Sequence, residues 1–130
     1  MNAFRREWVN SVKPFASECV DRKYIDLVNV VSKRRSLTQN EYAYVKVIRE
    51  ESKDLDAMLE IHKSIILIDA ALYKDNVSEA NDLVRTLHDY LSTYEMREKL
   101  KEFPDSKELL NYNKLRDKLS RLNIIYGLMC

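Results

Sequence analysis

The sequence predicts an all-α fold, a compact bundle of five or six helices, from three observations. Its 130 residues include one glycine and two prolines, whereas the tight turns between strands need glycine or asparagine. Leu, Glu, Lys and Arg, which favour helices, are abundant. Apolar residues recur at intervals of three and four, as on a helix with one buried face. At this length we expect one domain, residues 1–130.

The first helix is expected over about residues 14–35. Its apolar residues recur at intervals of 4, 4, 3 and 4: Ala16, Val20, Tyr24, Leu27 and Val31. Such a stripe predicts a helix with one buried side.

A second helical region is expected to start at Thr38, since Glu41 three residues later completes a capping box. Its apolar stripe alternates intervals of 3 and 4: Val45, Ile48, Ser52, Leu55, Leu59, His62 and Ile66. The pattern fits one helix longer than thirty residues, or two helices broken near SKDLD with Asp54 as a new cap. We favour the single helix.

The stretch from Ser64 to Leu91 has the pattern of an antiparallel helical hairpin, with Asn76 as the cap of its second arm. No second copy of this unit occurs, so the sequence does not predict a repeat array. Two further caps are expected at Ser92 and Asp105, each followed three residues later by glutamate.

A last helix is expected near the end of the chain, closed by Gly127 as its C-terminal cap. Its stripe recurs at intervals of 3, 4, 3 and 4: Tyr112, Leu115, Leu119, Leu122 and Tyr126. No apolar run is long enough to cross a membrane, and no signal peptide is recognisable. We therefore expect a soluble, intracellular protein, located in the cytoplasm or in a host-cell cytoplasm.

The single glycine excludes several functional loops at once. A phosphate-binding loop, a dinucleotide fingerprint, a calcium-binding loop and a nucleophile elbow all need glycine at defined positions. The two histidines, His62 and His88, lie far apart in sequence from each other and from both cysteines, so no metal site is expected. Asp56 and Glu60 share a helical face, which we interpret as solvated and ion-paired. We expect no catalytic residues, no cofactor, no small-molecule substrate and no enzymatic activity.

Charge is distributed unevenly along the chain. Residues 1–36 carry 8 basic and 4 acidic side chains, residues 37–80 carry 5 and 9, and residues 81–130 carry 9 and 8. The basic first third and the acidic middle can neutralise each other, bind an acidic partner, or pair two copies. We favour internal neutralisation.

A nucleic-acid interface is the alternative that this basic third allows. The basic residues that we assign to it are Arg5, Arg6, Lys33, Arg34 and Arg35, and the aromatic residues Phe4, Trp8 and Tyr24 lie in the same third of the chain. Basic groups that reach phosphates, beside aromatic rings that stack on bases, are typical of binding to RNA or to single strands. Lys33 to Arg35 also fit the end of a helix, where cations stabilise the free carbonyl groups.

The function that we predict is a non-enzymatic helical module for protein–protein interaction or regulation. Its partner is another protein or a second copy of the chain, with nucleic acid as the alternative partner and no membrane. Four tyrosines lie next to the apolar stripes and are candidate interface residues: Tyr42, Tyr44, Tyr90 and Tyr94. The composition, low in glycine and rich in Lys, Asn, Tyr and Ile, is also typical of an AT-rich genome such as that of a virus, phage or parasite.

Overall fold

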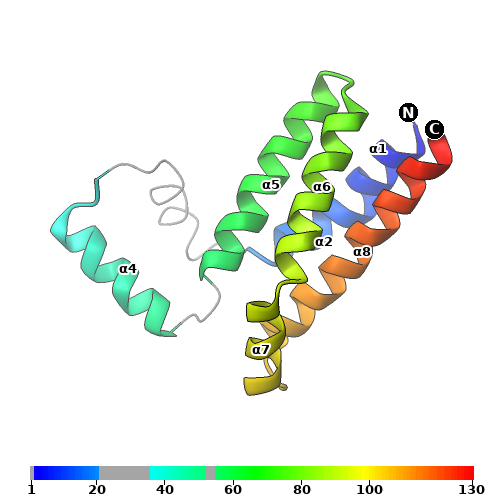
Figure 1. The fold of residues 1–130 in the computed structure, drawn as a ribbon. Helices are drawn as coiled ribbons and strands as arrows, with labels where there is room; N and C mark the ends of the chain where they lie inside the picture. Colours follow the sequence, from blue (N-terminus) through cyan, green and yellow to red (C-terminus); the bar gives the residue numbers. More distant parts are fainter. Residues whose placement is uncertain (1, 21–35, 52–54) are drawn as a thin grey trace.

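The computed structural model describes residues 2–20, 36–51 and 55–130 (Figure 1). Within these ranges the chain is helical and contains no strand, which confirms the predicted all-α class. Counting the uninterrupted N-terminal run as one, the described residues form six helices, in agreement with the predicted five or six.

The N-terminal run is made of α1 (Ala3–Glu7), a π-helical turn η1 (Trp8–Val12) and α2 (Lys13–Glu18). Asn2 caps its start by accepting a hydrogen bond from the Arg5 amide at 2.7 Å. The π-turn ends at Val12, two residues before Pro14, and its wide bond runs from the Lys13 amide to the Trp8 carbonyl. Such turns accommodate a residue that cannot donate to the helical ladder.

The predicted helix over residues 14–35 is therefore wrong at its start, because Pro14 lies inside a helix that begins at Ala3. It is also wrong after Glu18, where the helix ends in a turn at Cys19 and Val20. The rest of that prediction, residues 21–35, lies outside the described residues.

The predicted helical hairpin is present as α5 (Leu55–Tyr73) and α6 (Val77–Leu91). Asp75 turns the chain with a positive φ of 56°, in the left-handed region that Asp tolerates better than most residues. Asn76 then accepts the Glu79 amide at 3.0 Å, which confirms the predicted cap of the second arm.

The short helix α7 (Tyr94–Glu102) and the long helix α8 (Lys107–Met129) complete the chain. Neither starts at its predicted cap. The Ser92 hydroxyl instead donates to the His88 carbonyl at the end of α6, because a serine there finds a free carbonyl one turn back. Ser106 caps α8 by accepting the Leu109 amide at 3.3 Å, one residue after the predicted Asp105.

Gly127 does not end α8, which continues to Met129 with no positive φ at the glycine. The stripe of this helix is confirmed, since Tyr112, Leu115 and Leu119 are buried. A single apolar side fixes which face of a helix packs, whatever residue ends it.

Four helical walls enclose the core. The N-terminal run packs against α5 through α2 and against α8 through α1 and η1, while α6 packs against both α5 and α8 (Figure 1). Each wall contributes fully or nearly fully buried side chains: Phe4, Trp8, Val12 and Ala16; Ile61, Ile68 and Leu72; Val84, Leu87 and Leu91; Leu115, Leu119 and Leu122. This closed arrangement is that of a four-helix bundle, with α7 packed against α8.

Helix α4 (Gln39–Glu51) lies to one side of the bundle (Figure 1). Its predicted capping box is complete, with the Glu41 amide donating to the Thr38 hydroxyl and the Thr38 amide donating to the Glu41 carboxylate, both at 3.1 Å. The described part of α4 ends at Glu51 and that of α5 begins at Leu55; residues 52–54, on which the choice between one helix and two depends, lie outside the described residues. Of the α4 side chains that the structure describes, residues 39–47, only Val45 is buried.

Candidate functional site

Two basic residues of the N-terminal run are bound to the carboxyl-terminal half of α5. The Arg5 guanidinium donates to the Leu72 carbonyl and forms an ion pair with Asp75 at 2.6 Å. Lys13 forms an ion pair with Asp69, also at 2.6 Å. These contacts join the basic first third to the acidic middle, as internal neutralisation predicts.

The aromatic residues beside them are part of the core. Trp8 is fully buried and donates its indole N–H to Asp69 Oδ1 at 2.8 Å. Phe4 is fully buried in edge-to-face contact with Tyr126, with ring centroids 6.3 Å apart. Neither ring is accessible for stacking on a base.

The other residues predicted for nucleic-acid binding are not brought together by the described structure. Arg6 is exposed on α1. Lys33, Arg34 and Arg35 lie outside the described residues, as does Tyr24. The described part of the predicted interface therefore offers one exposed arginine.

The three predicted interface tyrosines whose side chains are described, Tyr42, Tyr44 and Tyr90, do not form one surface. Tyr42 and Tyr44 are 65% and 50% exposed on α4, but residues two apart on a helix point about 200° apart. Tyr90 is half-buried and packs against the core at the end of α6. The side chain of Tyr94 lies outside the described residues.

A different apolar surface lies along the solvent side of α5, and we call it the outer seam. Its residues recur at intervals of 4, 3, 4 and 3: Leu59, Lys63, Ile66, Ala70 and Tyr73. Ile66 is 54% exposed and Tyr73 91% exposed, and Leu67 beside them is exposed as well. The other side of the same helix buries Ile61 and Ile68 in the core.

The sequence places this outer seam only in part. Val45 and Leu55 of the predicted stripe are buried, but Ile66 is exposed and Leu59 and His62 are half-buried. The second half of the stripe does not follow the buried side because α5 has apolar residues on both sides, so a 3–4 spacing can be drawn along either. The excess of apolar residues in this segment could have revealed the exposed surface, because a helix that is apolar on all sides is normally buried by neighbouring structure.

The outer seam has lysines near both of its ends. Lys63 lies within it, and Lys74 directly follows Tyr73. Among the described residues neither lysine forms an ion pair, and both are exposed. The exposed apolar residues Ile66, Leu67 and Tyr73 thus lie between two exposed lysines, Lys63 and Lys74.

The titratable residues singled out in the sequence do not form an enclosed site. His88 Nδ1 lies 3.2 Å from Asp89 Oδ1, in a contact open to solvent. Asp56 is exposed and Glu60 half-buried on α5. In the described ranges, no group of three or more His, Cys, Asp or Glu side chains is placed to hold a metal ion.

Comparison of the chain with protein-family models, with curated proteins and with solved structures finds no match. Among the described helices, none is both long enough and apolar enough to cross a lipid bilayer.

Proposed function

We propose that this protein is a non-enzymatic interaction module that binds an amphipathic helix of another protein along the outer seam of α5. One observation carries the proposal. Ile66, Ala70 and Tyr73, at the coiled-coil intervals of 4 and 3, are exposed on a helix whose opposite side is held in the core.

The spacing of the outer seam favours a helical partner. Intervals of 4 and 3 keep side chains in line with those of a second helix that crosses at a shallow angle. Ala70 leaves room for close approach between Ile66 and Tyr73. Tyrosine is enriched among the residues that contribute most to binding, and Tyr73 is the most exposed large apolar side chain of α5.

The charge around the outer seam favours a partner helix with acidic flanks. Lys63 and Lys74 would lie beside those flanks and discriminate against basic partners. The same charges disfavour a second copy, because antiparallel pairing of two α5 helices brings Lys63 of one copy toward Lys74 of the other. We therefore assign the outer seam to a different protein.

An intracellular location is part of this proposal. Cys19 and Cys130 are both free thiols. Free thiols persist in reducing compartments, which supports a partner inside the cell.

The test uses two designed amphipathic peptides of about 21 residues, three heptads with Leu and Ile in the apolar positions. One carries Glu at the flanking positions and the other Lys. Fluorescence anisotropy of labelled peptide measures the Kd at physiological salt. We expect the Glu-flanked peptide to bind and the Lys-flanked peptide to bind at least about tenfold more weakly.

Variants of the protein identify the surface. Ile66→Glu and Tyr73→Glu should each weaken binding of the Glu-flanked peptide by about tenfold or more. The matched control is Thr86→Glu, an exposed position on the outer side of α6, which should leave the Kd unchanged. Equal loss in the control, or no binding of either peptide, contradicts the proposal.

Two further measurements test the two other partners, a second copy of the chain and a nucleic acid. Sedimentation equilibrium that shows a dimer abolished by Ile66→Glu would assign the outer seam to a second copy. RNA binding at physiological salt that requires Arg6, Lys33, Arg34 and Arg35 would favour the nucleic-acid alternative instead.

A further inference from the structure

A second feature of the bundle lies away from the outer seam, where the end of α6 meets α7 and α8. A small hollow of about 40 Å3 opens there, lined by Leu91, Met96, Arg97, Leu100, Leu109, Asn113 and Arg116. A single water needs about 10–15 Å3 by this measure, so the hollow holds about three waters or one carboxylate or phosphate group.

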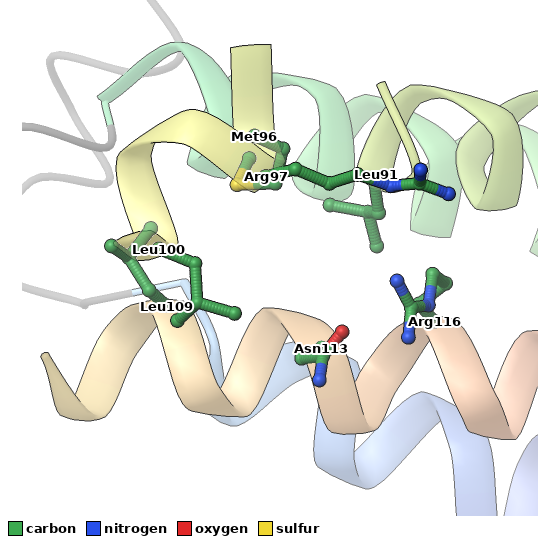
Figure 2. A pocket seen from close by; sticks show the side chains of 7 residues that line it. All are labelled: Leu91, Met96, Arg97, Leu100, Leu109, Asn113 and Arg116. Atoms are coloured by element: carbon green, nitrogen blue, oxygen red, sulfur yellow. The ribbon is translucent and has the colours of Figure 1, made fainter. Parts of the chain in front are cut away.

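The polar groups of the hollow lie at the same end as Leu91, away from Leu100 and Leu109. Figure 2 shows the guanidinium groups of Arg97 and Arg116 at one end, with the amide of Asn113 beside them. Leu100 and Leu109 lie at the other end. Arg97 comes from α7 and Arg116 from α8, so two separate helices aim positive charge at one place.

The polar groups of the hollow have little to bind within the protein. Arg116 has a side chain only 26% exposed, and the carboxylate paired with it is that of Asp117, 3.5 Å away and itself mostly in solvent. That distance is long for a charge-assisted hydrogen bond, and a guanidinium has five N–H donors. In the described structure the side chains of Arg97 and Asn113 have no hydrogen-bond or ionic partner.

Two like charges facing one hollow repel each other unless an anion lies between them. None of the residues that line it is acidic. Arginine is well suited to bind the paired oxygens of a carboxylate or phosphate, and the asparagine amide adds a further donor. The leucines at the opposite end favour an apolar group attached to that anion.

We propose that this hollow binds a small organic anion, a carboxylate or phosphate group that carries a short apolar chain. The anionic group lies between Arg97 and Arg116, and the chain extends over Leu100 and Leu109. The site is separate from the outer seam and does not depend on the function proposed for it.

The test titrates isotope-labelled protein with hexanoate, hexyl phosphate, acetate, inorganic phosphate and hexanol at constant ionic strength, followed by amide chemical shifts. We expect saturable shifts in α7 and around Asn113 with hexanoate or hexyl phosphate, and the tighter of the two identifies the anionic group. Acetate, inorganic phosphate and hexanol should each bind at least about tenfold more weakly, since each lacks one half of the ligand.

Arg97→Gln and Arg116→Gln should each weaken the tighter ligand by about tenfold. Arg97 is exposed, so its variant keeps the test valid if Arg116→Gln alters the fold. The matched control is Arg85→Gln on the outer side of α6, which should change nothing. Hexanol binding as tightly as hexanoate, an equal loss in Arg85→Gln, or the absence of saturable shifts would each overturn the proposal.

Discussion

The two arms of the central hairpin have different outer sides. On α6 the outward positions are polar, among them Asp82, Arg85 and Asp89, and the apolar residues face the core. On α5 the core side is equally apolar, yet Ile66 and Tyr73 face solvent. A four-helix bundle needs only one apolar side from each helix. The exposed apolar residues of α5 exceed what such a bundle requires, and the binding role proposed above rests on this excess.

The sharpest test of this comparison uses two isoleucines on opposite sides of α5. Ile68 is fully buried, so Ile68→Ala should lower the free energy of unfolding by about 2–5 kcal/mol. Ile66 is largely exposed, so Ile66→Ala should change it by less than about 0.5 kcal/mol. Urea denaturation of both variants measures the difference. Equal losses would show that the outer side of α5 is also needed for folding.

A smaller effect is expected at the polar contact that holds the N-terminal run on α5. Asp69→Ala removes the acceptor of the buried Trp8 indole and the partner of Lys13. The free energy of unfolding should fall by about 1–3 kcal/mol, mainly because the buried Trp8 N–H loses its acceptor. The ion pair with Lys13 is partly exposed and contributes little.

Asp82→Ala on the outer side of α6 is the control for this variant, since Asp82 is exposed and its carboxylate has no ion-pair partner among the described residues. Its stability should stay within about 0.5 kcal/mol of the wild type. A loss in Asp69→Ala no larger than in this control would mean that Trp8 does not depend on Asp69.

The start of α6 tests the turn that separates the two arms. Asn76→Ala removes the side chain that accepts the Glu79 amide and should cost about 1 kcal/mol, the usual value of an N-cap. Ser78→Ala, two residues later and exposed, should be nearly neutral. Thermal unfolding compares the two, and similar melting temperatures would exclude Asn76 as the cap that starts α6.

The same contrast explains how far the sequence predicted the fold. On helix α8 the regular 3–4 stripe coincides with the buried side, so its residues Leu115 and Leu119 were predicted correctly. Helix α5 has apolar residues on both sides, so spacing alone did not decide that Ile68 is buried and Ile66 exposed. That choice depends on which helices pack nearby, and a single helix pattern does not contain this information.

The N-terminal run shows a different limit. Pro14 is a reliable start signal in a regular helix, but here a π-turn places it inside one. Phe4 and Trp8, which are buried in the core together with Val12, were consequently interpreted as aromatic residues near basic charge. The hollow between Arg97 and Arg116 was also missed, because its residues come from three helices and no sequence spacing links them.

Cys19 offers the test with the smallest effect at neutral pH. It belongs to the core cluster that covers the inner side of α5, and burial, helped by the nearby Glu18 charge, raises the pKa of its thiol from 9.0 to about 12. The native state therefore holds this proton more tightly than the unfolded chain. The protonated Cys19 thiol therefore contributes its full stabilisation of the folded state below pH 9, and this contribution is lost as the pH rises from about 9 to about 12.

At neutral pH the Cys19 thiol should thus stay protonated in both the folded and the unfolded protein. Between pH 9 and pH 11 the free energy of unfolding of the wild type should fall faster than that of Cys19→Ala. Iodoacetamide at pH 8 should label the exposed Cys130 and leave Cys19 unmodified, since a buried, protonated thiol is a poor nucleophile. Mass spectrometry of the labelled protein and urea denaturation across this pH range measure both effects. If Cys19 reacts as fast as Cys130, the N-terminal run does not stay closed over α5, and both sides of that helix are accessible to a partner.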